Sequence, residues 1–556
     1  MVSDIVKRLL RARGIAEEDF AAFLNPTLSD IGDVEELPGV SEAAEVILSA
    51  VAAGREIVVF GDYDCDGISA TAIMVKTLAA LDAKVSAFLP ERFEEGYGMS
   101  ENSIKRLISE YPGTELVITV DNGINAIEQI AYLKTIGIDV VVTDHHLPTR
   151  DVSGEDSVML LPDAAAIVCP KVEADAAGRF LALCGAGVAF FLAKKIMTEA
   201  KLRQMYSGPN IGGPLLVLAG MATVTDTMPL LGVNRILVAE ALKHFKVWAP
   251  IGLKELYTRA VRIASERLTS RDFGFLLGPR INAAGRVANG GESLELVLSD
   301  DREIARELAR IVDLRNHERR GIEQKMSEEA LSKVIEGASA QVIDLPDGHQ
   351  GVSGIVAARV LGKLQKVPVF VIAGGHGSAR APDGFNVRDA LEACSQVLVR
   401  YGGHAAAGGF SIQEGKIDEF RRLMCEYCTT VRSVENASVE EKGPDVWLSL
   451  SDVTLSLAEE LLLLEPFGEA NEEPVFGIKG VTFSSVKPLG SDGRHLMLSV
   501  QNSKLKGIFW NRGDLVEPLR RASAEKHDVL FCLNVSDFGE RHVELRVVSI
   551  KQEGSL

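Results

Sequence analysis

Three short stretches in the first half of this chain carry acidic or imidazole side chains directly after an apolar run. They are GDYDCDG at 61–67, VDNGI at 120–124 and TDHH at 143–146. A pair of aspartates two residues apart, such as Asp64 and Asp66, can direct two carboxylates into one pocket. Carboxylates gathered in one place repel each other unless cations lie between them. The pattern therefore predicts a metal site, and the number of acidic groups favours two ions.

The elements that must position these groups follow from the residues around them. Residues 57–60, 116–120 and 140–143 are apolar and rich in β-branched side chains, which is typical of strands buried on both faces. Helical patterns separate them, for example over 70–81, and strands alternating with helices predict a parallel sheet. Such sheets carry their sites at the carboxyl ends of the strands. Six residues are therefore expected at one edge: Asp64, Asp66, Asp121, Asp144, His145 and His146.

A fourth carboxylate follows the apolar segment 214–230, in which Asp226 stands between two threonines. Oxygen ligands together with one imidazole, that of His145, suit Mn²⁺ or Mg²⁺ better than a metal that prefers thiolates. Asp144 is expected to orient a histidine ring. His146 is expected to contact a phosphate oxygen or to protonate a leaving group.

Composition limits the partners of the chain. The net charge of −19, from 59 basic and 78 acidic residues, weakly disfavours nucleic acid. However, residues 250–325 hold 14 basic and 12 acidic side chains, and residues 351–412 hold 6 and 3, so the middle of the chain is electropositive. The seven scattered cysteines argue against a disulfide framework, and no apolar run reaches the roughly 20 residues of a membrane span. We expect a cytoplasmic protein that does not enter a membrane.

Changes in pattern along the chain predict its division. A helical extension over 1–50 precedes an α/β region at 51–245. A linker at 246–334 contains a long helix from about residue 304, because its apolar residues recur at helical spacing. A second α/β lobe is expected at 335–432. Short alternating runs bounded by turn residues predict a small β-barrel at 433–556.

Three further motifs have two interpretations each. Gly185-Ala186-Gly187 resembles part of a dinucleotide-binding fingerprint, but close helix packing explains it better because the third glycine is absent. The small residues of GPRINAAGR at 278–286 could let a polyanion approach the backbone, whereas its arginines could equally be structural. GGHAAAGG at 402–409 could clasp a phosphodiester chain or simply form a tight turn.

The motifs DYDCDG, VDNGI, TDHH and TVTD, in this order, resemble the four motifs of the DHH phosphoesterases. PRINAAGR, GVSGIVAAR, GSAR, YGGHAAAGGF and LEPFGEANEEPVF extend the resemblance to the bacterial single-strand-specific exonucleases of that family, from about residue 10 onward. The resemblance implies an α/β fold with a parallel-sheet DHH lobe, a long connecting helix, a smaller DHHA1 lobe and a C-terminal OB-type β-barrel. It also implies 5′-to-3′ hydrolysis of single-stranded DNA to 5′-mononucleotides by a two-metal mechanism.

The resemblance assigns roles to individual residues. Metal ligands would be Asp64, Asp66, Asp121, His145 and Asp226, with Asp121 as the bridge, and the metals would be two divalent cations, Mn²⁺ or Mg²⁺. His146 would contact the substrate, with Asp62 and Asp144 in support. Arg280 would grip the terminal phosphate. The substrate-binding set is Arg280, Asn282, His349, Ser353, Arg380 and His404. Gly348-His349-Gln350 departs from the family pattern, which leaves the roles of His349 and Ser353 open.

The resemblance also implies single-stranded DNA as the partner, with a helicase and a single-strand-binding protein, and a monomeric state. Bases could stack on Phe467, Phe476, Phe509 or Trp510 in the barrel. One alternative is a phosphodiesterase for short oligoribonucleotides or cyclic dinucleotides, which would not need the long C-terminal region. Another is a metal-free relative that only binds or scaffolds DNA, which should have lost ligands.

Overall fold

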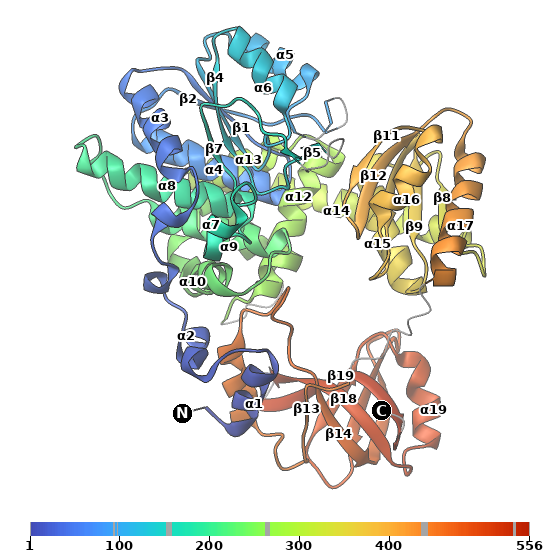
Figure 1. Cartoon of the computed structure of the whole chain (residues 1–556). Helices are drawn as coiled ribbons and strands as arrows, with labels where there is room; N and C mark the ends of the chain where they lie inside the picture. The colour runs from blue at the N-terminus through green and yellow to red at the C-terminus, as the bar shows by residue number, and fades with distance from the viewer. Residues whose placement is uncertain are drawn as a thin grey trace.

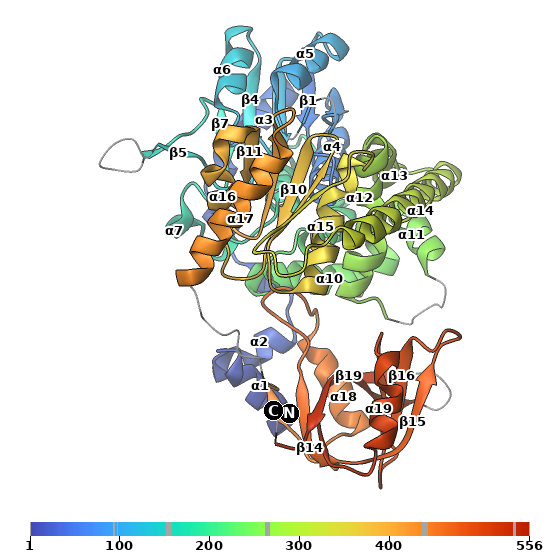
Figure 2. The same cartoon turned by 90° about the vertical axis from the view of Figure 1, so that its right-hand side faces the viewer.

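The computed structural model describes residues 2–92, 95–96, 98–151, 158–261, 267–434, 443–536 and 541–554. Figure 1 shows a first α/β lobe in blue to green, a second α/β lobe in yellow and orange, and a C-terminal β domain in red. In Figure 2 the second lobe stands in front of the first, and the C-terminal domain lies below both.

The first lobe is built on a five-stranded parallel sheet with the order β2-β1-β3-β4-β7. Its strands are β1 (Ile57–Phe60), β2 (Val85–Phe88), β3 (Leu116–Val120), β4 (Asp139–Thr143) and β7 (Ala166–Val168). Every residue of β1 and β3 is buried, as expected for strands covered on both faces. The chain places β2 on one side of β1 and the later strands on the other. The carboxyl ends of β1 and β3 therefore flank a topological switch point, where such sheets bind ligands.

Helices cover both faces of this sheet. Ile57 and Val59 face a core shared with α3 (Val40–Ala52), α4 (Cys65–Ala80) and α8 (Gly185–Leu202). Val58 and Phe60 face the opposite core, which includes α5 (Glu101–Glu110) and α6 (Ile127–Thr135). The remaining α-helices of the lobe are α7 (Ala174–Ala177), α9 (Gly212–Thr225), α10 (Gly232–Trp248), α11 (Ile251–Ala260), α12 (Gly278–Val287) and α13 (Gly291–Leu298).

A long helix, α14 (Arg302–Ser332), leads from the first lobe to the second. It contains 31 residues and packs against α11, α12 and α13 on one side and against α15 (Gln350–Leu364) of the second lobe. The Asp301 side chain caps its start by accepting hydrogen bonds from Glu303 N and Ile304 N. The expected connecting helix is present, and it begins at Arg302, two residues before the predicted start at about residue 304.

The second lobe has a five-stranded mixed sheet with the order β11-β12-β10-β9-β8. β8 (Gln341–Asp344) and β9 (Val369–Ala373) are parallel, and the other pairs are antiparallel. The remaining strands are β10 (His376–Arg380), β11 (Leu398–Gly403) and β12 (Ala407–Ile412). Besides α15, its helices are α16 (Val387–Ala393) and α17 (Ile417–Val434).

The C-terminal domain has a seven-stranded sheet with the order β13-β14-β18-β19-β17-β16-β15. Its strands are β13 (Val446–Trp447), β14 (Phe476–Val481), β15 (Phe483–Leu489), β16 (His495–Val500), β17 (Lys506–Phe509), β18 (His527–Ser536) and β19 (His542–Gln552), and its helices are α18 (Leu455–Leu461) and α19 (Val516–Arg521). Phe476 and Phe509 belong to its core. They are buried and cannot offer a face to a base, whereas Trp510 is half exposed.

The N-terminal 50 residues are divided between two cores. The apolar face of α1 (Asp4–Ala12), formed by Val6, Leu9 and Leu10, packs into the core of the C-terminal domain. In contrast, α3 belongs to the core of the first lobe. The expectation of one helical extension over 1–50 therefore hides a connection between the two ends of the chain, which local periodicity does not encode.

Within the described parts of the chain, no single helix is long and apolar enough to cross a membrane. One bent pair, Ala174–Phe180 with Gly185–Leu202, meets that test by length and composition only.

Candidate metal centre

Asp62 and Asp64 lie in the loop that joins β1 to α4, and Asp66 lies in the first turn of α4. Asp64 is the N-cap of α4, and its Oδ1 accepts hydrogen bonds from Asp66 N and Gly67 N, both at 3.0 Å. Gly67 packs against the backbone of Asp62, where an added Cβ would lie 2.7 Å from the Asp62 nitrogen. The DxDxDG sequence therefore folds back tightly on itself and directs its carboxylates to the end of the sheet.

The carboxylate of Asp66 is held by the N-terminus of α8. Gly185 N donates to its Oδ2 at 2.7 Å, and Ala186 N donates to its Oδ1 at 2.8 Å. A Cβ on Gly185 would lie 2.5 Å from Asp121 Oδ1, so only glycine fits there. The sequence interpretation of Gly185-Ala186-Gly187 as helix packing missed this contact. Glycine at the start of a helix, where amides hold an anion, was the available signal.

Asp121 follows β3 and has a left-handed backbone with φ of 63°. Its backbone nitrogen donates to Thr143 O at 3.0 Å, which fixes the end of β3 beside the end of β4. Burial, followed by the charges of Asp66, Asp64, Asp62 and Asp226, raises the pKa of the Asp121 carboxyl well above its usual range. This is the electrostatic signature of acidic groups arranged to receive a cation.

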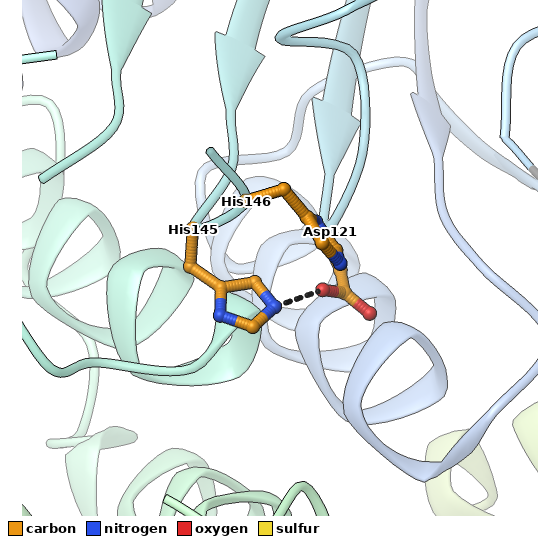
Figure 3. Close-up of side chains that lie close together, drawn as sticks. All are labelled: Asp121, His145 and His146. Carbon is orange, nitrogen blue, oxygen red and sulfur yellow. Dashed lines mark ion pairs between the residues drawn. The ribbon is translucent and has the colours of Figure 1, made fainter. Parts of the chain in front are cut away.

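His145 follows β4 and lies among the carboxylates. Its Nε2 is 3.1 Å from Asp121 Oδ1 and 3.8 Å from both Asp66 Oδ2 and Asp226 Oδ2. Figure 3 shows its ring directed at Asp121. Burial lowers the pKa of His145, although Asp66 opposes this. A neutral imidazole is the form that can ligate a metal.

His146 is positioned by Asp144, which is fully buried. The His146 Nδ1–H donates to Asp144 Oδ1 at 2.7 Å, and Ile124 N donates to Asp144 Oδ2 at 2.9 Å. Burial disfavours the imidazolium, but the bond to Asp144 and the nearby carboxylates outweigh it and raise the pKa of His146 to about 9. Asp144 thus lies behind the histidines, as predicted for an orienting residue.

Asp226 ends α9 and completes the group. Burial, with the charges of Asp66 and Asp64, raises the pKa of its carboxyl to about 8. Three sets of candidate ligand atoms each lie within 4.8 Å of one another: Asp121, His145 and His146; Asp66, His145 and Asp226; and Asp62, Asp64 and Asp121. Asp62 Oδ1 and Asp226 Oδ2 are buried and have no hydrogen-bond partner among the described residues. Divalent cations would supply these partners. Asp62, predicted to be only supporting, thus lies in a ligand set.

Three family models match the chain. The DHH family N-terminal domain matches residues 56–212, the DHHA1 domain 337–430 and the RecJ OB domain 444–549. The single-stranded-DNA-specific exonuclease RecJ of Salmonella typhimurium is 34% identical, over 98% of this chain and 95% of the relative. This chain belongs to the RecJ family. The Bacillus subtilis RecJ is 31% identical over 93% of this chain, which spans 64% of that relative's length.

A crystal structure of Thermus thermophilus RecJ in complex with Mn²⁺ has a TM-score of 0.82 to this chain at 30% identity. The match covers 99% of this chain and 76% of that one. The predicted fold class, with its DHH lobe, DHHA1 lobe and C-terminal OB domain, is confirmed. From here the first lobe is the DHH lobe, the second is the DHHA1 lobe, and the C-terminal domain is the OB domain.

Helix α12, which carries the GPRINAAGR motif of this RecJ-family chain, packs against the aspartate loop. The Cys65 backbone nitrogen donates to Asn282 Oδ1 at 2.6 Å, and a Cβ on Gly285 would lie 2.6 Å from the Tyr63 carbonyl oxygen. The small residues therefore allow the aspartate loop to pack closely against α12. The sequence had suggested instead that they could let a polyanion approach the backbone. Asn282 supports the loop that carries the candidate ligands.

Arg280 is buried in the same helix, where its hydrogen bonds are made to other parts of the protein. Its Nε donates to Asp313 Oδ1 at 2.9 Å, and its Nη1 donates to Leu276 O at 2.8 Å. Two of its three guanidinium nitrogens are therefore engaged within the protein. The sequence could not show this pairing, because Asp313 lies 33 residues away on α14.

A cleft of about 400 Å³ lies between the DHH and DHHA1 lobes. Tyr63 and Arg92 line it from the DHH lobe, and Ser353, Ser378 and Arg400 are among the residues that line it from the DHHA1 lobe. Arg92 stacks over Tyr63, with its guanidinium carbon 5.1 Å from the ring centroid, next to the aspartate loop. The cleft thus joins the candidate metal centre to basic and hydroxyl groups.

The other predicted DHHA1 contacts are more dispersed. Ser353 Oγ lies 2.8 Å from Ser378 Oγ in the cleft, and the half-buried Arg380 lies close to Gly354. His349 caps α15 and lines a pocket that adjoins the cleft, since Gln350 and His376 line both. His404 is exposed in the turn between β11 and β12. The structure brings Ser353 to the cleft but leaves His349 and His404 outside it.

Proposed function

We propose that this chain is a metal-dependent exodeoxyribonuclease that degrades single-stranded DNA from its 5′ end to 5′-mononucleotides, in DNA repair and recombination. The observation that carries the proposal is the group of five aspartates and His145 at the switch point of the DHH sheet, beside a cleft between two lobes. The named activity of the RecJ relatives and the Mn²⁺ in the Thermus thermophilus structure support it.

Two divalent cations, Mn²⁺ or Mg²⁺, fit the two of the three candidate ligand sets that contain at least two carboxylates. Asp66, His145 and Asp226 would hold one, and Asp62, Asp64 and Asp121 would hold the other. Asp121 also lies 3.1 Å from His145, so it is suited to a place between the sets. When bound, such ions activate water and stabilise charge on phosphoryl oxygens.

The residues around the ions orient the substrate and supply a proton. Asp144 fixes the His146 ring through its Nδ1, beside the candidate ligands Asp121 and His145, where the ring could contact a phosphate or leaving-group oxygen. Burial raises the pKa of the Cys65 thiol to about 12, so no thiolate is available there for covalent catalysis. The roles of His146 as the substrate-contacting residue and of Asp144 as its orienter follow from this arrangement.

The cleft suits the end of a single strand. Arg92 and Arg400 face it from the two lobes, and Ser353 and Ser378 add hydroxyl donors. A planar guanidinium can donate two parallel hydrogen bonds to a phosphate. We assign the terminal 5′-phosphate to the Arg92 side of the cleft, beside the aspartate loop, in place of Arg280. A narrow cleft between lobes would exclude a duplex sterically.

A phosphodiesterase for short oligoribonucleotides or cyclic dinucleotides is the second candidate activity. Against it, the OB domain is fastened to the DHH lobe: Arg235, on α10, donates to the carbonyl oxygens of Leu464 at 3.0 Å and Glu465 at 2.9 Å. A strand-holding domain fixed to the catalytic lobe serves a long substrate. A scaffold without catalysis is disfavoured because all five predicted metal ligands are retained.

The test compares three substrates labelled at the 3′ end: single-stranded DNA, duplex DNA and a short RNA, each with Mn²⁺, with Mg²⁺ and with EDTA. We expect metal-dependent loss of nucleotides from the 5′ end of single-stranded DNA, and little cleavage of duplex. Preferential cleavage of the short RNA would favour the second candidate. Cleavage of no substrate would favour the scaffold.

We further propose that the chain works as a monomer in the cytoplasm. A helicase would supply the single strand, and a single-strand-binding protein would be displaced from it. Size measurement with and without DNA would test the monomeric state, and stimulation of degradation by each partner would test the two associations.

A further inference from the structure

Phe275 is the most exposed aromatic side chain among the described residues, with 66% of its surface accessible. It lies in the π-helix Asp272–Leu277, directly before α12. π-helical turns are rare and often occur at functional sites, because their wide turn displaces side chains from the positions an α-helix would give them. An aromatic ring held out into solvent by such a turn requires an explanation.

Local contacts hold this turn in place. Asp272 Oδ2 accepts hydrogen bonds from Thr269 N at 2.7 Å and from Thr269 Oγ1 at 2.9 Å. Phe273 is fully buried, and its ring centroid lies 5.9 Å from that of Phe245. Leu277 is also buried. With its neighbours on either side anchored in the core, Phe275 is presented outward by a rigid support.

The turn joins the metal centre to the OB domain. After it, Gly278 packs so closely against Thr225 that an added Cβ would lie 2.3 Å from the threonine methyl carbon. Thr225 directly precedes the candidate ligand Asp226. Before the turn, Ser270 Oγ donates to Phe467 O, at 2.5 Å, in the segment that leads into the OB sheet. Phe275 therefore lies between the two parts of the protein that the proposed function assigns to chemistry and to strand holding.

A cation accompanies the ring. The guanidinium carbon of Arg271 lies 5.3 Å from the centroid of Phe275, within the range of a cation–π contact. An exposed aromatic face beside a cation matches single-stranded nucleic acid, because the ring stacks on a base and the cation attracts the backbone. The buried Phe476 and Phe509 of the OB domain cannot serve in this way.

We propose that Phe275 and Arg271 form a stacking platform for an unpaired nucleobase of the strand that runs from the OB domain to the metal centre. This inference rests on the proposed function and adds a binding site to it. The platform lies outside the metal centre, so it should govern binding of strands long enough to reach it and leave the hydrolytic step unchanged.

The experiment compares the parent protein with Phe275→Ala, Phe275→Trp and the control Val247→Ala, which removes a side chain of 73% exposure from α10. Binding of a 3′-fluorescein 20-nucleotide DNA is measured by anisotropy in EDTA, and cleavage of 20- and 4-nucleotide strands is measured in Mn²⁺. Loss of a stacked base should weaken binding and raise KM for the long strand by about ten- to a hundredfold in Phe275→Ala. Phe275→Trp and Val247→Ala should retain parent values, as should cleavage of the short strand by all variants.

A set of 20-nucleotide strands, each with a single abasic site at a different position, tests whether the contact is made to a base. In the parent protein, one position should show weakened binding, and Phe275→Ala should abolish that difference. Parent-like binding by Phe275→Ala, or a positional effect that persists in it, would overturn the platform alone. If the parent binds the strand but cleaves neither length, the proposed function fails while the platform stands. No binding by the parent would overturn both.

Discussion

Arg280 Nε lies 2.9 Å from Asp313 Oδ1, and this ion pair ties α12, which supports the aspartate loop, to the long helix α14. Arg259 Nε lies 3.1 Å from the other oxygen of the same carboxylate. Both Arg280 and Asp313 are buried. The pair therefore fixes the angle at which α14 leaves the DHH lobe, and with it the position of the DHHA1 lobe across the cleft.

Arg280→Ala should destabilise the protein, because it leaves a buried carboxylate with one of its partners removed. We expect a loss of about 3 kcal/mol in the free energy of unfolding of the DHH lobe. Chemical denaturation, followed by tryptophan fluorescence, measures it. Arg310→Ala on α14 is the control, since the pair of Arg310 with Glu307 is exposed and should contribute little to stability. Equal free energies of unfolding for Arg280→Ala and Arg310→Ala would contradict the structural role of Arg280.

Arg92→Ala should reduce the preference for a 5′-phosphate over a 5′-hydroxyl. Loss of a charged hydrogen bond of about 1.5–3 kcal/mol corresponds to roughly ten- to a hundredfold. Rates on both substrates, labelled at the 3′ end, measure the preference. Arg280→Ala, assayed at a temperature where it stays folded, should keep the preference of the parent. If Arg280→Ala loses the preference and Arg92→Ala keeps it, Arg280 binds the terminal phosphate, as the resemblance of the GPRINAAGR motif implied.

The sequence could predict that the candidate ligands lie together, because the signals for their positions are local. An aspartate or histidine directly after a buried strand must lie at the carboxyl edge of a parallel sheet, so Asp64, Asp121 and His145 could be placed from their neighbours alone. Contacts between distant segments could not be placed in this way. The Asp313 partner of Arg280, the Gly185 amide on Asp66 and the packing of α1 into the OB domain all depend on tertiary structure.

The exposure of aromatic side chains could not be predicted from the sequence either. Phe476 and Phe509 occur in alternating strands, and either face of such a strand can point inward. The structure buries both and leaves Trp510 half exposed. The π-helix around Phe275 differs from an α-helix by its hydrogen bonds and not by an obvious residue pattern, so the exposure of Phe275 could not be predicted from the sequence.

Asp121→Asn should abolish hydrolysis and leave the fold intact. Asn tolerates the left-handed backbone of this position, φ of 63°, better than Ala does, so the substitution isolates the charge. We expect a loss of at least a thousandfold in kcat, because a carboxylate suited to lie between both ligand sets is removed. Thermal unfolding in EDTA serves as the folding control. A variant that retains more than a tenth of parent activity would exclude a bridging role.

Gly185→Ala should weaken metal binding although it replaces no candidate ligand. The new Cβ would lie 2.5 Å from Asp121 Oδ1 and must displace the carboxylate or the start of α8. We expect the Mn²⁺ concentration for half-maximal activity to rise by about tenfold or more, which corresponds to a cost of roughly 1.4 kcal/mol. Gly321→Ala is the matched control, because its Cβ would meet nothing within 4 Å on α14. It should stabilise the helix by about 0.5–1 kcal/mol and leave the Mn²⁺ dependence unchanged.

Asp226→Asn should make the metal-free protein more stable while it removes activity. In the absence of cations, the Asp226 carboxylate is buried close to Asp66 and Asp64, which raise its pKa together with burial. At pH 9, above the Asp226 pKa of about 8, the carboxyl is ionised and a neutral amide relieves this repulsion, so the melting temperature in EDTA should rise by about 2–4 °C. At pH 7, where the parent carboxyl is mostly protonated, the difference should be smaller. Mn²⁺ should raise the melting temperature of the parent more than that of the variant, because cations offset the same repulsion and the variant lacks one ligand. A lower melting temperature for Asp226→Asn in EDTA would show that this carboxylate stabilises the fold on its own. The charge crowding that we infer for the centre would then be absent.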